Sequence, residues 1–114
     1  DYAPYTNQFF VLTMGRTLIC TEGETIIPVD SIDNITAGDK VSFIKMDIEG
    51  AELDALKGAE QTIKKVHPKL AISAYHKFED LLEIPQFIQV IDSSYKFYLR
   101  RHSHLVHELV LYAL

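Results

Sequence analysis

The sequence has one cysteine, no long apolar run and few basic residues, and each shortage excludes a class of protein. Cys20 stands alone, so no internal disulfide can form, and the chain fits a reducing compartment with the cytoplasm as its expected location. Eleven Lys and Arg against sixteen Asp and Glu give a net charge of −5, which offers no basic field to a phosphate backbone. We therefore expect no nucleic-acid partner.

A bilayer-spanning helix needs about 20 consecutive apolar residues, and no stretch of the sequence approaches that length. Lys45, Asp47 and Glu49 interrupt the longest hydrophobic stretch. We expect a soluble protein with no membrane partner. The 114 residues, of which 47% are hydrophobic and 24% charged, suffice for one hydrophobic core and not for two domains.

Residues 1–40 are predicted to form an extended lead-in and a small β-hairpin segment. Residues 1–8 lack helical or strand periodicity. Three runs rich in β-branched and aromatic residues are predicted strands, namely 9–13, 16–21 and 25–29. Gly15 lies between the first two, as in the turn of a hairpin. Asp30 and Ser31 then offer side-chain oxygens that can cap a helical turn.

Residues 41–114 have the alternating pattern of an α/β domain. The predicted strands are 41–48, 69–76, 95–101 and 108–113. The predicted helices are 51–66 and two short pieces within 78–91, separated at Pro85. Because a full helix separates the first two strands, we expect them to lie parallel in a right-handed βαβ unit. The short connection between the last two strands makes that pair antiparallel.

Acidic side chains end the first of these strands. Lys45, Asp47 and Glu49 are spaced by two and so project from one face, and Gly50 permits a tight turn into the helix. Ligands bind outside the carboxyl ends of strands in open parallel sheets, where His76 ends the neighbouring strand. We therefore predict a cluster of two carboxylates and an imidazole. It could take the proton of a substrate hydroxyl, and it could equally bind a divalent metal.

Structural roles can account for the same residues. Glu49 could favour the positive end of the helix dipole, Asp47 could pair with Lys45, and His76 could be a strand-end histidine without chemistry. The three histidines of residues 102–107 fit no standard zinc pattern. No residue is therefore assigned as the ligand of a resident metal.

A family resemblance is carried by the run Lys45-Met-Asp-Ile-Glu-Gly-Ala-Glu-Leu, continued by Leu56-Lys-Gly-Ala and by Pro68. This pattern resembles the FkbM family of S-adenosylmethionine-dependent methyltransferases. The resemblance implies part of a doubly wound, Rossmann-like sheet. In that sheet residues 41–48 are the fourth strand and 70–76 the fifth, and the antiparallel hairpin at 95–114 supplies the sixth and seventh.

The resemblance also implies methyl transfer from S-adenosylmethionine to a small-molecule hydroxyl acceptor. Asp47 and Glu49 would position the acceptor, and His76 would assist as general base. The segment Ser31-Ile32-Asp33 resembles the short Leu-Asp segment that precedes this motif in the family, near the place of the cofactor's adenine. Asp33 is the one cofactor-binding candidate.

The glycine-rich turn that holds the cofactor in such folds is missing from the sequence. The five glycines are never closer than eight residues apart, so no such turn can be built from them. Since the sequence also starts at Asp1 rather than Met, we expect the C-terminal portion of a methyltransferase, or a truncated relative, inactive and without cofactor on its own. The alternative is a non-catalytic interaction module. The fourth strand would then have an open edge, and we expect a homodimer through strand pairing or exchange of residues 1–40.

Overall fold

The computed structural model describes residues 29–37, 39–104 and 108–114 of the chain. The lead-in and hairpin predicted before residue 29, and Cys20 within them, lie outside the described residues. The elements, in chain order, are α1 (Ile32–Thr36), β1 (Phe43–Met46), α2 (Glu52–Lys57), α3 (Glu60–Val66), β2 (Lys69–Ser73), α4 (Asp80–Ile91), β3 (Phe97–Arg101) and β4 (Leu109–Ala113). No helix among the described residues is long and apolar enough to cross a membrane.

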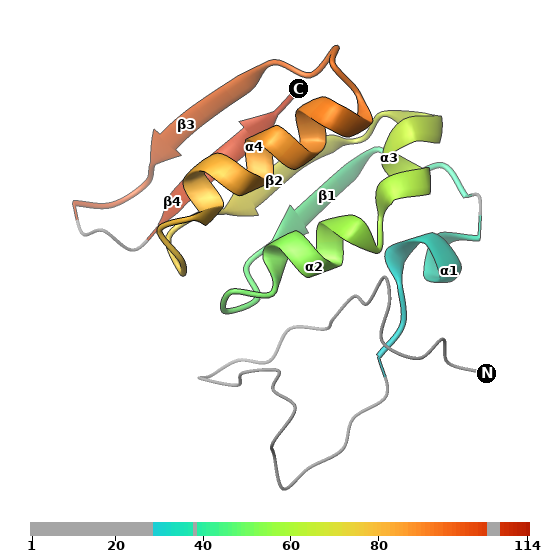
Figure 1. Cartoon of the computed structure of the whole chain (residues 1–114), viewed down its shortest axis with the longest axis horizontal. Coiled ribbons are helices and arrows are strands. Elements are labelled where there is room, and N and C mark those ends of the chain that lie inside the picture. The colour runs from blue at the N-terminus through green and yellow to red at the C-terminus, as the bar shows by residue number, and fades with distance from the viewer. Residues whose placement is uncertain (1–28, 38, 105–107) are drawn as a thin grey trace, which may run out of the picture.

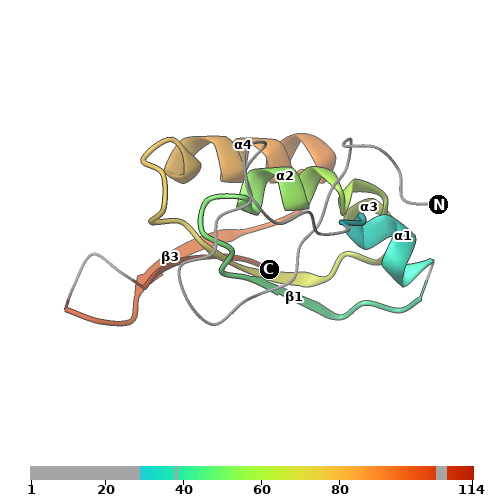
Figure 2. The same cartoon turned by 90° about the horizontal axis from the view of Figure 1, so that it is seen from below.

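The four strands form one sheet in the order β1-β2-β4-β3. β1 and β2 are parallel, as the helical connection between them requires, and β4 pairs antiparallel with both β2 and β3. The helices α2, α3 and α4 cover one face of the sheet (Figures 1 and 2). This arrangement confirms the predicted partial Rossmann-like α/β fold with an antiparallel C-terminal hairpin.

The core lies between β2 and the helices. Leu70 and Ile72 alternate along β2 and point to the same face, where both are 0% exposed. The helices place apolar side chains at three- and four-residue steps against them. Those that are fully buried are Leu56, Ile63, Ile84 and Ile88. This packing fixes the βαβ unit whose carboxyl end carries the candidate site.

Residues 51–66 form two helices rather than the one predicted. α2 ends at Lys57 and α3 begins at Glu60. Gly58 is a poor helix former, and its carbonyl oxygen accepts a 2.8 Å hydrogen bond from the backbone N–H of Asp33. The chain therefore turns at this position and starts a second helix.

The prediction of two helical pieces around Pro85 was wrong, because α4 runs unbroken from Asp80 to Ile91. Proline removes one hydrogen bond of the helical ladder and costs about 3 kcal/mol in a helix interior. Ile84 and Ile88, on either side of it, are fully buried against the sheet. Their burial stabilises the helix by a comparable amount, about 1.5 to 3 kcal/mol for each side chain, and so outweighs the local preference.

Candidate functional site

The carboxyl ends of β1 and β2 bring three predicted site residues together. The two strands are in parallel register, with Met46 opposite Ile72, so the segments that follow them leave the same edge of the sheet. His76 Nε2 lies 3.6 Å from Asp47 Oδ1 and 3.5 Å from Glu49 Oε2. The side chain of His76 is 9% exposed, whereas those of Asp47 and Glu49 are each 42% exposed. One buried imidazole thus faces two carboxylates that solvent can reach.

A left-handed turn, and not the continued strand, places Glu49. β1 ends at Met46, so the predicted alternation does not extend to Glu49. Glu49 and Gly50 both have positive φ, of 57° and 96°. A φ of 96° is one that residues with a side chain rarely adopt, so the turn favours glycine at position 50, whereas the 3.0 Å approach of a Cβ atom to the flexible Lys77 Cε could be relieved by movement of that side chain. The turn brings Glu49 back toward His76.

Glu52, in the first turn of α2, is a further member of the cluster that the sequence reasoning missed. Its side chain is fully buried, and its Oε1 atom lies 2.9 Å from His76 Nδ1. The same oxygen accepts a 2.9 Å hydrogen bond from the backbone N–H of Ile48. The sequence does contain a sign of this role, because Glu52 falls on the apolar face of the helix with Ala55 and Leu56. A carboxylate on such a face needs a buried partner, which here is the imidazole.

Several buried polar atoms of the cluster make no hydrogen bond among the described residues. They are Glu52 Oε2, His76 Nδ1, His76 Nε2 and Asp80 Oδ2. Nδ1 lies 2.9 Å from Glu52 Oε1 without the geometry of a hydrogen bond, and the two groups form an ion pair when the imidazole is protonated. Each buried polar group left without a hydrogen bond costs about 1 to 3 kcal/mol. The cluster therefore has unused capacity to bind hydrogen-bonding groups or a cation.

Tyr75 and Asp80 each interact with one carboxylate of the cluster, Asp47 and Glu52 respectively. The Tyr75 hydroxyl donates a 3.1 Å hydrogen bond to Asp47 Oδ1. Burial, followed by the charge of Asp47, raises the pKa of Tyr75 to about 12, so this hydroxyl remains a donor at neutral pH. Asp80 is 2% exposed, and burial together with the charge of Glu52 raises the pKa of its carboxyl group.

A cavity of about 390 Å³ reaches the cluster at Asp47 and Tyr75. Lys45 and Ser73 also line it, from positions that alternate with the helix-covered residues of β1 and β2. It therefore lies on the face of the sheet opposite the helices. Its volume is within the range of about 300 to 1,000 Å³ that is usual for small-molecule sites.

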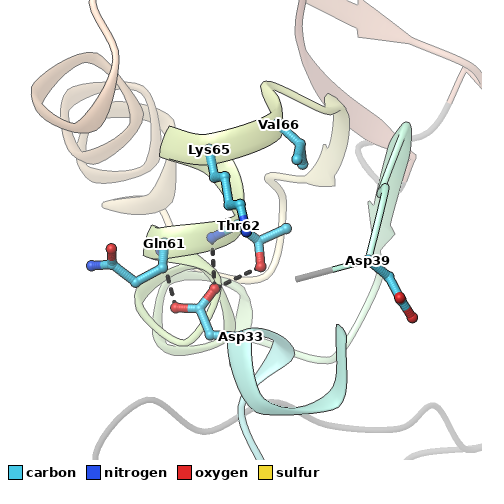
Figure 3. Close-up of a pocket in the computed structure, with 6 residues that line it drawn as sticks. All are labelled: Asp33, Asp39, Gln61, Thr62, Lys65 and Val66. Atoms are coloured by element: carbon cyan, nitrogen blue, oxygen red, sulfur yellow. Dashed lines mark hydrogen bonds between the residues drawn. The ribbon is translucent and has the colours of Figure 1, made fainter. Parts of the chain in front are cut away.

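The structure does not bring Asp33 to this cluster. Asp33 lies on α1, near the beginning of β1 rather than its carboxyl end (Figure 1). Its carboxylate accepts hydrogen bonds from the backbone N–H of Gln61 at 3.0 Å and from the N–H and hydroxyl of Thr62, both at 2.7 Å (Figure 3). A second cavity, of about 150 Å³, adjoins these residues. Both carboxylate oxygens thus accept hydrogen bonds from the first turn of α3. The cofactor-binding role of Asp33 stays a prediction.

Known proteins identify the family of this chain. Residues 12–99, more than half of its length, match the family model of the Methyltransferase FkbM domain. The chain belongs to the FkbM methyltransferase family. The predicted resemblance is therefore confirmed, and the family implies S-adenosylmethionine as the cofactor of the intact fold. No curated protein sequence matches this FkbM-family chain significantly.

The crystal structure of a methyltransferase FkbM from Methylobacillus flagellatus KT is similar to this FkbM-family chain. The two are 48% identical in sequence and superpose with a TM-score of 0.73. The similarity covers 77% of this chain and 23% of the other. The chain thus spans about a quarter of the length of that relative.

The described residues do not by themselves fit the cofactor of the FkbM family. Their two glycines, Gly50 and Gly58, lie before and after α2, and neither belongs to a glycine-rich turn after a strand. The carboxylate of Asp33, the predicted cofactor ligand, is already hydrogen-bonded to α3. The part of the FkbM domain that the structure describes therefore holds the strand-end cluster and no complete cofactor cradle.

Proposed function

We propose that this chain supplies the acceptor side of an S-adenosylmethionine-dependent O-methyltransferase that acts on a small-molecule hydroxyl. The observation that carries the proposal is the position of His76 between the carboxylates of Asp47 and Glu49 at the carboxyl ends of two parallel strands. Methylation of a hydroxyl oxygen releases its proton. An imidazole beside carboxylates is suited to accept that proton near neutral pH.

Each residue of the cluster has a distinct role in this proposal. The solvent-accessible carboxylates of Asp47 and Glu49 hold the acceptor hydroxyl near His76 Nε2, and this nitrogen takes the hydroxyl proton. The buried carboxylate of Glu52, 2.9 Å from Nδ1, stabilises the imidazolium ion that forms. Tyr75 fixes the orientation of Asp47 through its hydrogen bond.

We propose that S-adenosylmethionine binds to a longer protein that contains this chain, and not to the 114 residues alone. The matched relative is several times longer than the segment it shares with this chain, and the described residues lack a complete cofactor cradle. We therefore expect the 114-residue chain to show no low-micromolar affinity for S-adenosylmethionine in calorimetry. Low-micromolar binding would contradict this part of the proposal.

Methyl transfer by a full-length protein that contains this chain tests the roles of the cluster. The variants are Asp47→Asn and His76→Gln, and S-adenosylhomocysteine formation is measured by mass spectrometry. Loss of a general base lowers kcat by about 100-fold or more, so we expect at least that effect for His76→Gln. Asp54→Asn, on the exposed side of α2, is the matched control and should leave kcat unchanged. Unchanged transfer by both cluster variants would refute the assignment.

A second candidate function, a dimeric interaction module, is favoured by the edge position of β1. Within the described part of the chain, β1 pairs only with β2 and ends the sheet. Phe43 on this strand is 53% exposed. An unpaired strand edge can pair with a second copy of the chain, which we propose as a homodimer. Light scattering that shows only a monomer at high concentration would rule this out.

A further inference from the structure

The strand-end cluster also has the composition and spacing of a divalent-cation site. Asp47, Glu52 and His76 each present one atom of a type that binds metals, and these atoms lie within 4.8 Å of one another. Ligands on opposite sides of a small divalent cation are roughly 4 Å apart, so a slight contraction would bring all three into contact with one ion. We infer that these residues bind a divalent first-row cation, represented by Mn²⁺.

Buried atoms that make no hydrogen bond supply further support for this site. His76 is 9% exposed and Glu52 is fully buried. Both imidazole nitrogens and Glu52 Oε2 make no hydrogen bond among the described residues. A cation bound here would give a partner to a buried carboxylate oxygen and to an imidazole nitrogen. The partly exposed Asp47 leaves a path by which the ion can enter.

The local charge favours a cation over a neutral ligand. Asp47, Glu49 and Glu52 surround one imidazole, and no lysine or arginine forms an ion pair with them in the described part of the chain. A donor set of one imidazole and two carboxylates suits Mn²⁺ and Zn²⁺ and contains no thiolate. Glu52 replaces Glu49 in the ligand set predicted from the sequence, because Glu52 is the carboxylate whose ligand atom lies close to both other ligands.

This inference goes beyond the proposed function and does not depend on it. A cation and a proton compete for the same imidazole, so an ion bound at this site alters how the acceptor loses its proton. Binding of the ion alone is measured without acceptor or cofactor. A negative result for the ion therefore leaves the methyl-transfer proposal standing.

Titration of the metal-free 114-residue chain with Mn²⁺ tests the site, with the electron paramagnetic resonance signal of free Mn²⁺ as the readout. We expect one site with a submillimolar Kd. Asp47→Asn and Glu52→Gln should each weaken binding at least tenfold. Glu52→Gln retains a side-chain oxygen that can accept from Ile48 N–H, and Asp54→Asn on the same helix is the matched control with unchanged affinity.

Thermal unfolding provides a second readout. Mn²⁺ should raise the unfolding midpoint of the unmodified chain and of the Asp54→Asn control equally, and it should raise that of Asp47→Asn less at the same concentration. If Glu52→Gln does not fold, the partly exposed Asp47→Asn carries the test alone. The absence of submillimolar binding would overturn the inference. Unchanged affinity in Asp47→Asn would do so too, because the ion would then occupy another site, such as one at His102 or His104.

Discussion

Replacement of Asp33 by alanine is expected to destabilise the packing of α1 on α3. The residue before α3 is Ala59, whose side chain cannot accept a hydrogen bond from the first turn of the helix. Asp33 performs this capping role through the backbone N–H groups of Gln61 and Thr62, which lie 28 and 29 residues later in the chain. The variant removes the carboxylate that accepts from both amides and from the Thr62 hydroxyl, which keeps only its 3.1 Å contact with the Thr36 hydroxyl.

The magnitude follows from these three contacts. Loss of a helix cap costs about 1 kcal/mol, and loss of a hydroxyl hydrogen bond to a charged acceptor adds about 1.5 kcal/mol. The amide of Gln61 reaches solvent and is rehydrated, which reduces the total. We expect the free energy of unfolding to fall by about 2 kcal/mol, which corresponds to a decrease of about 10 °C in the unfolding midpoint of a domain of this size.

Urea unfolding followed by circular dichroism measures this change. Asp39→Ala is the matched control, because Asp39 is exposed and lines the same small cavity, and its effect should stay within about 0.5 kcal/mol. A decrease of less than 0.5 kcal/mol for Asp33→Ala would refute the capping role. If Asp33 instead contacts the adenine, a full-length variant such as Asp33→Asn should lose cofactor affinity at unchanged stability.

Three further variants test the surroundings of the cluster. Because burial raises the pKa of Asp80, its contribution to stability is present below the ordinary pKa of 3.8 and is lost as the pH rises through the folded value. Asp80→Asn should therefore raise the unfolding midpoint at pH 7 and leave it nearly unchanged near pH 3. Asp47→Asn should lower the pKa of Tyr75 from about 12 in an ultraviolet tyrosinate titration, and an unchanged titration would contradict their contact. Gly50→Ala should cost about 1 to 2 kcal/mol in urea unfolding, because φ is 96° and the new methyl group would contact Lys77; a neutral effect would argue against the turn.

Local patterns were sufficient to predict the βαβ unit and failed at Pro85. The alternation of Leu70 and Ile72 and the helical connection between β1 and β2 determine a parallel pair, and these features lie within one stretch of sequence. The effect of Pro85 depends on how firmly Ile84 and Ile88 pack on the sheet. That packing involves residues distant in sequence. The rule that proline interrupts a helix therefore predicted two helical pieces where the structure has one continuous helix.

The sequence predicted those parts of the candidate site that lie directly after the two parallel strands. Asp47 and His76 follow two parallel strands, and this placement predicts their meeting, whereas Glu49 reaches His76 through the left-handed turn at residues 49–50. Glu52 was missed because an acidic residue in the first turn of a helix is usually explained by the helix dipole. The partner of Asp33 was not predictable either, since nothing in the local sequence indicates a contact 28 residues away.

The left-handed backbone of Glu49 implies a trade-off between stability and activity. At φ 57° an L-residue is strained by about 1 kcal/mol or more relative to glycine. Glu49→Gly should thus make the fold more resistant to heat while it removes a carboxylate beside His76. A laboratory screen for thermal tolerance would favour glycine at this position, and, under the proposed role of Glu49, a screen of a full-length protein for methyl transfer would retain glutamate. Opposite outcomes of the two screens would identify Glu49 as a residue whose value to the protein lies in its chemistry.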